Sequence, residues 1–346
     1  VCDKCGNATE NNVPSEVYWC SKCKVPVIKL VNDLNKNTCP LCSSKTNYMC
    51  TDLRPVFPQE RLLMGILQGK SLFYLNESVW RANNRYYIDG IPKRIPLTLF
   101  RNANIKLVNE RLEEHAQLGI EHFNNDIDRF IQANRERLLY LKNEAFSFIR
   151  STTSSFPQEN IVVSFSGGKD SSVVSDLVMR SLSNPSIVHI FGDTTLEFPL
   201  TIEYAKRFRE NNPKTIFKVA KNKEQDFYAV CEDIGPPSRL LRWCCSMFKT
   251  GPITRVLNNL FRDTKILTFY GIRRWESVSR SKYNRLENNA EVIKIQKQTV
   301  ASPIFFWKDI DVWLYLLGEK VDFNDAYKLG YDRVGCWCCP NNNTRD

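Results

Sequence analysis

The sequence lacks any apolar run of the length that a membrane span requires, which is about 20 residues. It also lacks a secretory signal at its start, so we expect a cytoplasmic protein. Histidine is scarce, with 3 in 346 residues, and no Ser/His/Asp arrangement for nucleophilic catalysis is evident. The upstream glycine of the Gly-x-x-x-x-Gly-Lys-Ser/Thr loop is missing too. These absences argue against membrane proteins, triad hydrolases and that class of nucleotide-binding loop.

Cysteine and positive charge, by contrast, are abundant. The chain has 13 cysteines, mostly in pairs with Cys-x-x-Cys spacing, and a net charge of +10. An odd count argues against a fully paired disulfide set, and such pairs in a reducing compartment favour metal ligation. The basic charge suits polyanionic partners such as nucleotides or nucleic acid, although a modestly basic enzyme without nucleic acid fits equally well.

Domains cluster at about 100–200 residues, so the length predicts two or three domains. Composition changes along the chain divide it into four parts. The cysteine-rich start resembles a zinc ribbon, and short aromatic and apolar runs broken by Pro and Gly then indicate a small β-rich domain. Apolar residues at helical spacing within 105–150 indicate two helices. The predicted parts are residues 1–55 (ribbon), 56–110 (β-rich), 111–150 (helical linker) and 151–346 (α/β domain).

From residue 160 onward, apolar strands alternate with helical patterns. This alternation predicts a parallel β-sheet with helices on both faces. The expected strands are 161–165, 186–191, 215–219 and 265–270, and the expected helices are 171–182, 201–211 and 309–317.

The first strand runs directly into the sequence Ser-Gly-Gly-Lys-Asp-Ser at 166–171, and a helix follows at once. Two glycines let the backbone approach an anion, and the N–H groups at a helix start favour phosphate. Lys169 adds positive charge, Ser166 and Ser171 offer hydroxyl groups, and Asp170 could hold a metal ion or orient the loop. A plain turn is the alternative, which the flanking strand and helix disfavour.

Residues 166–171 resemble the phosphate-binding motif of the PP-loop ATP pyrophosphatases, which grip the pyrophosphate of ATP and often adenylate a substrate. Three further segments resemble the phosphoadenosine phosphosulfate (PAPS) reductase-like branch of that superfamily. They are 193–199, with Thr195 where glycine is usual, 271–280, and 303–313 with its Asp-Val-Trp sequence. The resemblance covers roughly residues 155–340 and implies a Rossmann-like α/β fold.

The resemblance also implies a set of site residues. The catalytic candidates are Lys169, Asp170 and Arg273, with Mg²⁺ held through Asp170 or Asp193. Arginine forks match phosphate or sulfate oxygens, whereas a solvated basic loop is the alternative, above all for Arg274. The expected nucleotide- and phosphate-binding residues are Ser164, Ser166, Gly167, Gly168, Lys169, Asp170, Ser171, Asp193, Gly271, Arg273, Glu276 and Arg280.

Four cysteines in the second half of the chain, Cys244, Cys245, Cys336 and Cys339, resemble the Cys-Cys…Cys-x-x-Cys ligand set of adenylylsulfate reductases. The resemblance implies a [4Fe–4S] cluster, and the DNA-phosphorothioation ATP pyrophosphatases carry related cysteines. Structural zinc and buried free thiols are the alternatives. Cys338 is an extra thiol that could replace a ligand or carry sulfur, or be a bystander, and Cys231 is expected in the core.

The N-terminal cysteines predict a zinc site. Cys20, Cys23, Cys39 and Cys42 have zinc-ribbon spacing and are our preferred ligands. A set of Cys2, Cys5, Cys20 and Cys23 is the alternative, and Cys50 could complete a second site.

Two reactions and one non-enzymatic function remain open. The preferred reaction is cleavage of ATP to AMP and pyrophosphate, with adenylation of a substrate, such as a nucleic acid, for sulfur transfer from a sulfur-donor protein. The alternative is a sulfonucleotide reductase, for which a catalytic cysteine within Glu-Cys-Gly-x-His is expected, a motif that these 346 residues do not contain. The intact loop favours ATP. The third interpretation is an ATP-sensing, nucleic-acid-binding subunit without catalysis.

Overall fold

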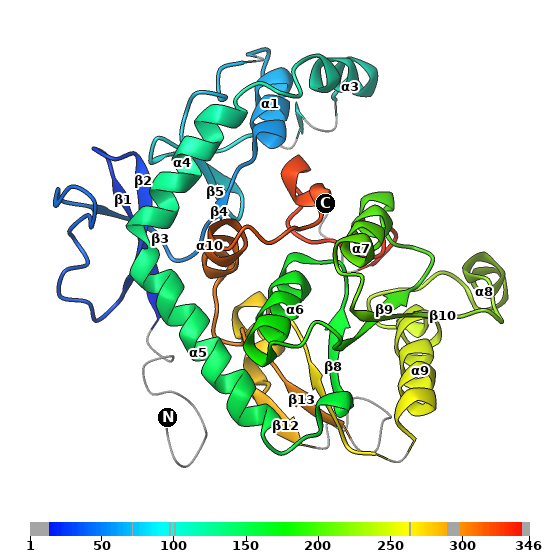
Figure 1. Ribbon diagram of the computed structural model, residues 1–346. Coiled ribbons are helices and arrows are strands. Elements are labelled where there is room, and N and C mark those ends of the chain that lie inside the picture. Colours follow the sequence, from blue (N-terminus) through cyan, green and yellow to red (C-terminus); the bar gives the residue numbers. More distant parts are fainter. Residues whose placement is uncertain are drawn as a thin grey trace. The chain divides into compact units, whose positions relative to one another are not determined.

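The computed structural model describes residues 14–70, 72–96, 98–99, 102–262, 264–288 and 298–340 (Figure 1). Its residues group into two compact units. Unit 1 draws on residues 1–141, 306–320 and 327–330, and unit 2 on residues 142–305, 321–326 and 331–346. Within the described ranges, every helix is too short or too polar to cross a membrane.

Unit 1 contains two small antiparallel sheets and, unexpectedly, an early helix. The sheets are ordered β2-β1-β3 and β4-β5-β6-β7. Helix α1 (Pro58–Leu67) lies in the region where β structure alone was expected, and a proline at its start suits a helix N-terminus. The strands are β1 (Ser15–Cys20), β2 (Val25–Leu30), β3 (Asn47–Cys50), β4 (Arg54–Pro55), β5 (Val79–Ala82), β6 (Arg85–Ile88) and β7 (Ile91–Lys93).

Three helices, rather than the expected two, follow these sheets. They are α3 (Ile105–Glu114), α4 (Ile120–Ala133) and α5 (Arg135–Thr153). Helix α4 buries one apolar face, as its 3.6-residue spacing predicts.

Helix α10 (Asp309–Gly318) belongs to unit 1, although the sequence suggested that it was part of the α/β domain. Arg137 donates two hydrogen bonds to the Asp311 carboxylate, each at 3.0 Å. Lys308 donates to the carbonyls of Ser15 and Thr51. The helix is therefore held by charged contacts to residues far away in the sequence, which helical periodicity could not reveal.

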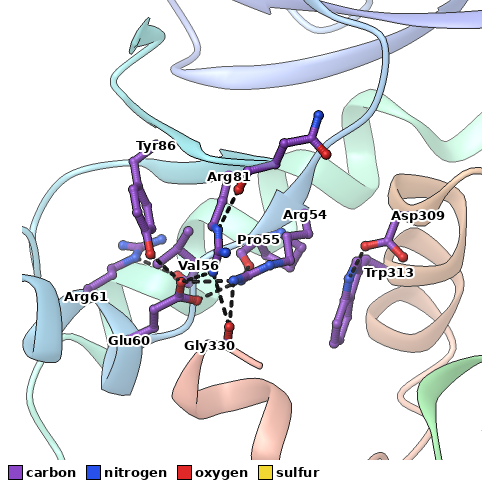
Figure 2. A network of polar contacts seen from close by, with 11 residues as sticks. Arg54, Pro55, Val56, Glu60, Arg61, Arg81, Tyr86, Asp309, Trp313 and Gly330 are labelled. Atoms are coloured by element: carbon purple, nitrogen blue, oxygen red, sulfur yellow. Dashed lines mark hydrogen bonds and ion pairs between the residues drawn. The ribbon is translucent and has the colours of Figure 1, made fainter. Parts of the chain in front are cut away.

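A buried polar network joins β4, β5 and α1 in unit 1 (Figure 2). The Glu60 carboxylate accepts hydrogen bonds from Arg54 at 2.7 and 2.9 Å, from Arg81 at 3.2 Å and from the Tyr86 hydroxyl at 3.0 Å. Burial alone would raise the pKa of Glu60, but the two guanidinium groups hold it below its ordinary value. Both arginines also donate to the Gly330 carbonyl, so the network fastens this distant segment.

Unit 2 is built on a six-stranded sheet of order β10-β9-β8-β11-β13-β12. All neighbouring pairs are parallel except β12 and β13, which are antiparallel. The expected parallel sheet is thus confirmed, with one antiparallel edge strand that was not expected. The strands are β8 (Ile161–Phe165), β9 (Val188–Asp193), β10 (Ile216–Lys221), β11 (Ile266–Phe269), β12 (Leu286–Asn288) and β13 (Gln298–Ala301).

Helices cover both faces of this sheet, as the alternation of elements predicts. On one face Val162 and Ile190 pack with Leu257 of α9 (Gly251–Phe261). On the other face Phe165 packs with Tyr204 of α7 (Pro199–Asn211). Alternate residues of a strand point to opposite faces of the sheet, so each strand contributes side chains to the apolar core on both faces. The remaining α-helices are α6 (Lys169–Leu182) and α8 (Phe227–Ile234). The short helices are the π-helix η3 (Cys245–Thr250) and the 3-10 helices η2 (Gln158–Asn160), η4 (Arg274–Glu276), η5 (Arg280–Lys282) and η6 (Asp325–Leu329).

Candidate functional site

The glycine loop connects β8 to α6 at the carboxyl end of the parallel sheet (Figure 1). Ser164 lies in β8 just before it. Gly167 has φ +71°, and a Cβ atom there would lie 2.9 Å from Thr201 Cγ2, so only glycine fits without strain. Gly168 is the N-cap of α6, and no side chain caps that helix. A helix start without a capping side chain is the arrangement at which N–H groups bind an anion.

The hydroxyl groups of the loop hold its shape. The Ser166 N–H donates to Ser171 Oγ at 3.2 Å, and Ser171 Oγ donates to the Gly168 carbonyl at 2.8 Å. From outside the loop, Asn324 Nδ2 donates to the Gly167 carbonyl at 3.2 Å. The loop is therefore organised before any ligand binds, and Asn324 is a supporting residue that the sequence did not single out.

The three predicted catalytic residues lie together. Arg273 Nε donates to Asp170 Oδ1 at 2.6 Å, and Lys169 Nζ is 3.5 Å from Asp170 Oδ2. Both cations are buried, with exposed fractions of 4% for Arg273 and 5% for Lys169. Gly271 allows this approach, because a Cβ atom there would lie 2.8 Å from the carbonyl carbon of Asp170. Two buried cations thus pair with the carboxylate of Asp170 at the start of α6.

A second group of charges follows in η4 and η5. The Glu276 carboxylate accepts a hydrogen bond from the Arg273 N–H at 3.2 Å and pairs with Arg280. Burial lowers the pKa of Arg280, and the positive charge of Arg333 lowers it further. Arg333 was missed by sequence reasoning. Its one signal was a cation three residues before Cys336.

Arg274, whose role the sequence left open, places its guanidinium 5.2 Å from the Trp275 ring centroid. This contact is a cation–π interaction.

Asp193 is the last residue of β9, and Thr195 lies in the turn that follows. Thr195 has φ +67°, a left-handed conformation that explains why glycine is usual at this position in similar sequences. Asp193 Oδ1 accepts from the Thr195 N–H at 2.8 Å, and Lys221 Nζ is 3.4 Å from Asp193 Oδ2. Glu197 accepts hydrogen bonds from Thr194, and burial raises its pKa. Carboxylate oxygens are thus present at the carboxyl edge of the sheet.

The four preferred N-terminal cysteines come together. The Sγ atoms of Cys20, Cys23, Cys39 and Cys42 all lie within 4.8 Å of one another. Two of these separations are 3.6 Å, between Cys20 and Cys42, and 4.0 Å, between Cys23 and Cys39. Four thiols at such short range suit one tetrahedral metal ion.

Cys50 does not join this group. Cys50 Sγ donates to the Asp52 carbonyl at 3.2 Å, and burial raises the pKa of Cys50 to about 12. Cys50 is thus a protonated thiol outside the four-cysteine group. Cys2 and Cys5 lie outside the described residues.

The C-terminal cysteines gather against an apolar cluster. Cys231, Cys244, Cys336 and Cys338 pack against side chains that include Leu196, Phe227 and Trp243. Cys231, expected in the core, is only partly buried there. Burial raises the pKa of Cys244 to about 11, and the neighbouring Cys245 and Cys336 contribute to that rise.

The Cys336–Cys339 segment is fastened to the turn after β9. Cys336 Sγ lies 3.3 Å from Thr194 Oγ1, and the Trp337 N–H donates to the Leu196 carbonyl at 2.8 Å. Within the described ranges, the N-terminal cysteines are the group whose ligand atoms come together as a metal-binding set.

The chain is similar to several known proteins. An uncharacterized protein of Methanocaldococcus jannaschii is 33% identical over 213 residues, which are 62% of this chain and 42% of that protein. The chain therefore spans less than half the length of this relative. The adenosine 5′-phosphosulfate reductase of Staphylococcus epidermidis is 25% identical over 53% of this chain and 71% of its own length. Among solved structures, the PAPS reductase of Candida auris in complex with phosphate matches 58% of this chain and 95% of its own, with 18% identity and a TM-score of 0.44.

Residues 160–342 match the phosphoadenosine phosphosulfate reductase domain. The match spans the glycine loop, the arginines of η4 and η5, and the C-terminal cysteines, and it covers more than half of the chain. The chain therefore belongs to the phosphoadenosine phosphosulfate reductase domain family.

Proposed function

We propose that the glycine loop binds ATP and that the enzyme cleaves it between the α- and β-phosphates, which adenylates an acceptor for sulfur transfer. An oxygen of the acceptor attacks the α-phosphorus, the bond from that phosphorus to the bridging oxygen breaks, and pyrophosphate leaves with the electron pair. The observation that carries this proposal is the pre-organised loop: an uncapped α6 N-terminus flanked by the buried cations Lys169 and Arg273.

Each predicted site residue would have a role that follows from its position at the loop. Lys169 and the first N–H groups of α6 would stabilise the negative charge that develops on pyrophosphate. Arg273 would hold Asp170, and through it the start of α6, in place. Mg²⁺, held by Asp170 or Asp193, would neutralise phosphate charge. Of the remaining predicted residues, Ser164, Gly271, Glu276 and Arg280 would complete the nucleotide site.

The cysteine sites would supply structure and sulfur chemistry. We propose zinc at Cys20, Cys23, Cys39 and Cys42, where it would stabilise the small ribbon. Cys244, Cys245, Cys336 and Cys339 would hold a [4Fe–4S] cluster, and Cys244 and Cys336 pack against the same apolar side chains. The ribbon and the net charge of +10 support a nucleic-acid acceptor, and a sulfur-donor protein would complete the cycle. We also propose that the chain divides into the four parts expected from its composition, with boundaries at residues 55, 110 and 150.

Pyrophosphate release tests the reaction. The assay supplies ATP and Mg²⁺ with tRNA or DNA as acceptor, and compares the wild type with Lys169→Ala and Asp170→Asn. Lys214→Ala, an exposed lysine before β10, is the control. We expect release by the wild type and the control, and a loss of about 100-fold or more in Lys169→Ala. Sulfite formation from a sulfonucleotide, without pyrophosphate release, would identify a reductase instead. ATP binding without turnover would indicate a sensor.

A further inference from the structure

The carbonyl of Gly167 in the glycine loop is held from outside the loop by a buried amide. Asn324 Nδ2 donates to that carbonyl at 3.2 Å and to Thr201 Oγ1 at 2.9 Å, and Asn324 Oδ1 accepts from the Ala326 N–H at 3.0 Å. The Asn324 side chain is fully buried, so each of these polar groups would cost free energy if it lost its partner. Asn324 therefore fixes the direction of the Gly167 carbonyl.

The direction of this carbonyl also decides where the next N–H group points. Within the described ranges every peptide bond is trans, and the C=O and N–H of a trans peptide point to opposite sides. The Gly168 N–H therefore points away from Asn324, and it donates to Ser166 Oγ at 3.4 Å. Because Gly168 is the N-cap of α6, Asn324 helps to orient the backbone at the helix start where phosphate is proposed to bind.

Asn324 is itself held in place by Arg207 of α7. Arg207 Nε and Nη2 donate to the two carboxylate oxygens of Asp322 at 2.8 and 3.1 Å, a fork that matches the geometry of a carboxylate. Arg207 Nη1 donates to Asp325 Oδ2 at 2.8 Å, and Nη2 also donates to the Phe323 carbonyl at 3.0 Å. One guanidinium group thus binds the residues immediately before and after Asn324.

Helix α7 also links this segment to α6. The Tyr204 hydroxyl donates to the Asp322 carbonyl at 2.9 Å and lies 2.7 Å from Ser172 Oγ. Tyr204 and Ser172 are both buried, and all of these residues belong to unit 2. Residues 322–325 are therefore bound to α7 at two points, Tyr204 and Arg207.

We propose that Arg207 is a positioning residue for the nucleotide site. By fixing Asn324, it keeps the Gly167 carbonyl turned away from the anion and the N–H that follows turned toward it. Arg207 contacts no phosphate in this role and acts only through residues 322–325. The assignment rests on the proposed function, because it requires that the glycine loop bind phosphate oxygens of ATP.

Nucleotide affinity and local hydrogen exchange test this role. Titration calorimetry measures binding of α,β-methylene-ATP, and hydrogen–deuterium exchange measures the opening of residues 166–172 without nucleotide. The variants are Arg207→Gln and Arg207→Lys, which keeps the charge but loses the fork. Because 34% of the Arg207 side chain is exposed, its replacement should leave the apolar core intact. The matched control is Arg209→Gln on the same helix, an exposed arginine whose guanidinium lies 5.7 Å from the Phe217 ring centroid.

We expect Arg207→Gln to weaken binding of the analogue by about tenfold and to speed exchange at residues 166–172. Arg207→Lys should lie between this variant and the wild type, and Arg209→Gln should match the wild type. In a double-mutant cycle, Arg207→Gln should add little to Asn324→Ala, because both act by the same route. Asp325→Asn, which changes one partner of the guanidinium, takes the place of Arg207→Gln if that variant does not fold.

Three results would decide against the role or against the proposed function. A lower free energy of unfolding in urea with unchanged affinity of the folded protein would show that Arg207 is merely structural, and so would overturn its positioning role. Additive effects in the cycle would overturn the route through Asn324. Faster exchange at residues 166–172 in Arg207→Gln, in a protein whose wild type does not bind the analogue, would uphold the link from Arg207 to the loop while refuting the proposed function.

Discussion

Arg273 donates a hydrogen bond to Asp170 at 2.6 Å and so ties the segment after β11 to the glycine loop after β8. The contact is largely buried, so its loss leaves a carboxylate without its closest cation. We predict that Arg273→Gln lowers kcat/KM for pyrophosphate release by about 100-fold. Arg274→Gln, which changes the cation over the Trp275 ring, should stay within about threefold of the wild type. Equal effects of the two substitutions would contradict a specific role for Arg273.

Gly271 allows the same contact between the segment after β11 and the start of α6, because it has no side chain. A Cβ atom at this position would lie 2.8 Å from the Asp170 carbonyl carbon and 2.9 Å from the Ser171 nitrogen, both of which are backbone atoms that cannot rotate away. Gly271→Ala should therefore displace the start of α6, weaken binding of α,β-methylene-ATP by about tenfold or more, and lower stability by about 1–3 kcal/mol. Gly335→Ala is the matched control, because nothing lies within 4 Å of its Cβ position. Normal nucleotide binding by Gly271→Ala would show that the loop tolerates the shift.

The sequence predicts local elements better than their partners. The strand at Ile161–Phe165 and the loop after it were predictable, because a buried apolar run followed by two glycines has few other interpretations. The place of α10 was not, because its partner Arg137 lies 174 residues from Asp311 in the chain. Arg333 was missed for the same reason: its position depends on contacts of Tyr331 and Cys336 with the turn after β9.

The N-terminal thiols should hold one equivalent of zinc. Cys39 is buried and lies within 4.8 Å of three other Sγ atoms, so Cys39→Ser removes a ligand that nothing nearby replaces. We expect this variant to lose the metal, measured by elemental analysis, and to become more sensitive to proteolysis within residues 14–50. Cys50→Ser should keep the full metal content, since the Cys50 thiol donates to a backbone carbonyl instead. Loss of zinc in both variants would mean that the ligand set is wrong.

A separate prediction concerns the C-terminal cysteines and the visible absorbance of the purified protein. If Cys336 and Cys339 are cluster ligands and Cys338 is not, anaerobically purified Cys336→Ser should lose its visible absorbance and its iron, and Cys338→Ser should keep both. Both substitutions are conservative and only two positions apart, so they control for each other. A wild type that is colourless and contains zinc at this site would replace the cluster with a structural ion.

Burial of His189 should make the free energy of unfolding of unit 2 depend on pH. Its side chain is fully buried in β9, with Nε2 2.8 Å from Ser175 Oγ and Nδ1 2.9 Å from the Ile187 carbonyl oxygen. Burial lowers the pKa of His189 from its ordinary 6.5 to about 4. Between these two values the unfolded chain binds a proton that the folded chain does not. The free energy of unfolding should therefore fall as the pH drops from about 6.5 to about 4, and this group should add no slope above that range.

The size of this effect follows from the shift, which corresponds to about 3 kcal/mol at most. Urea unfolding at a series of pH values, followed by circular dichroism, measures it. Because His189→Gln also changes the packing, and with it the stability at every pH, the comparison rests on the slope rather than on absolute stability. The slope between pH 4 and 6.5 should flatten in His189→Gln and persist in His122→Gln, whose ring is 33% exposed in unit 1. Parallel curves for wild type and His189→Gln would show that the buried imidazole does not control the acid response, which would then come from the carboxylates that titrate in the same range.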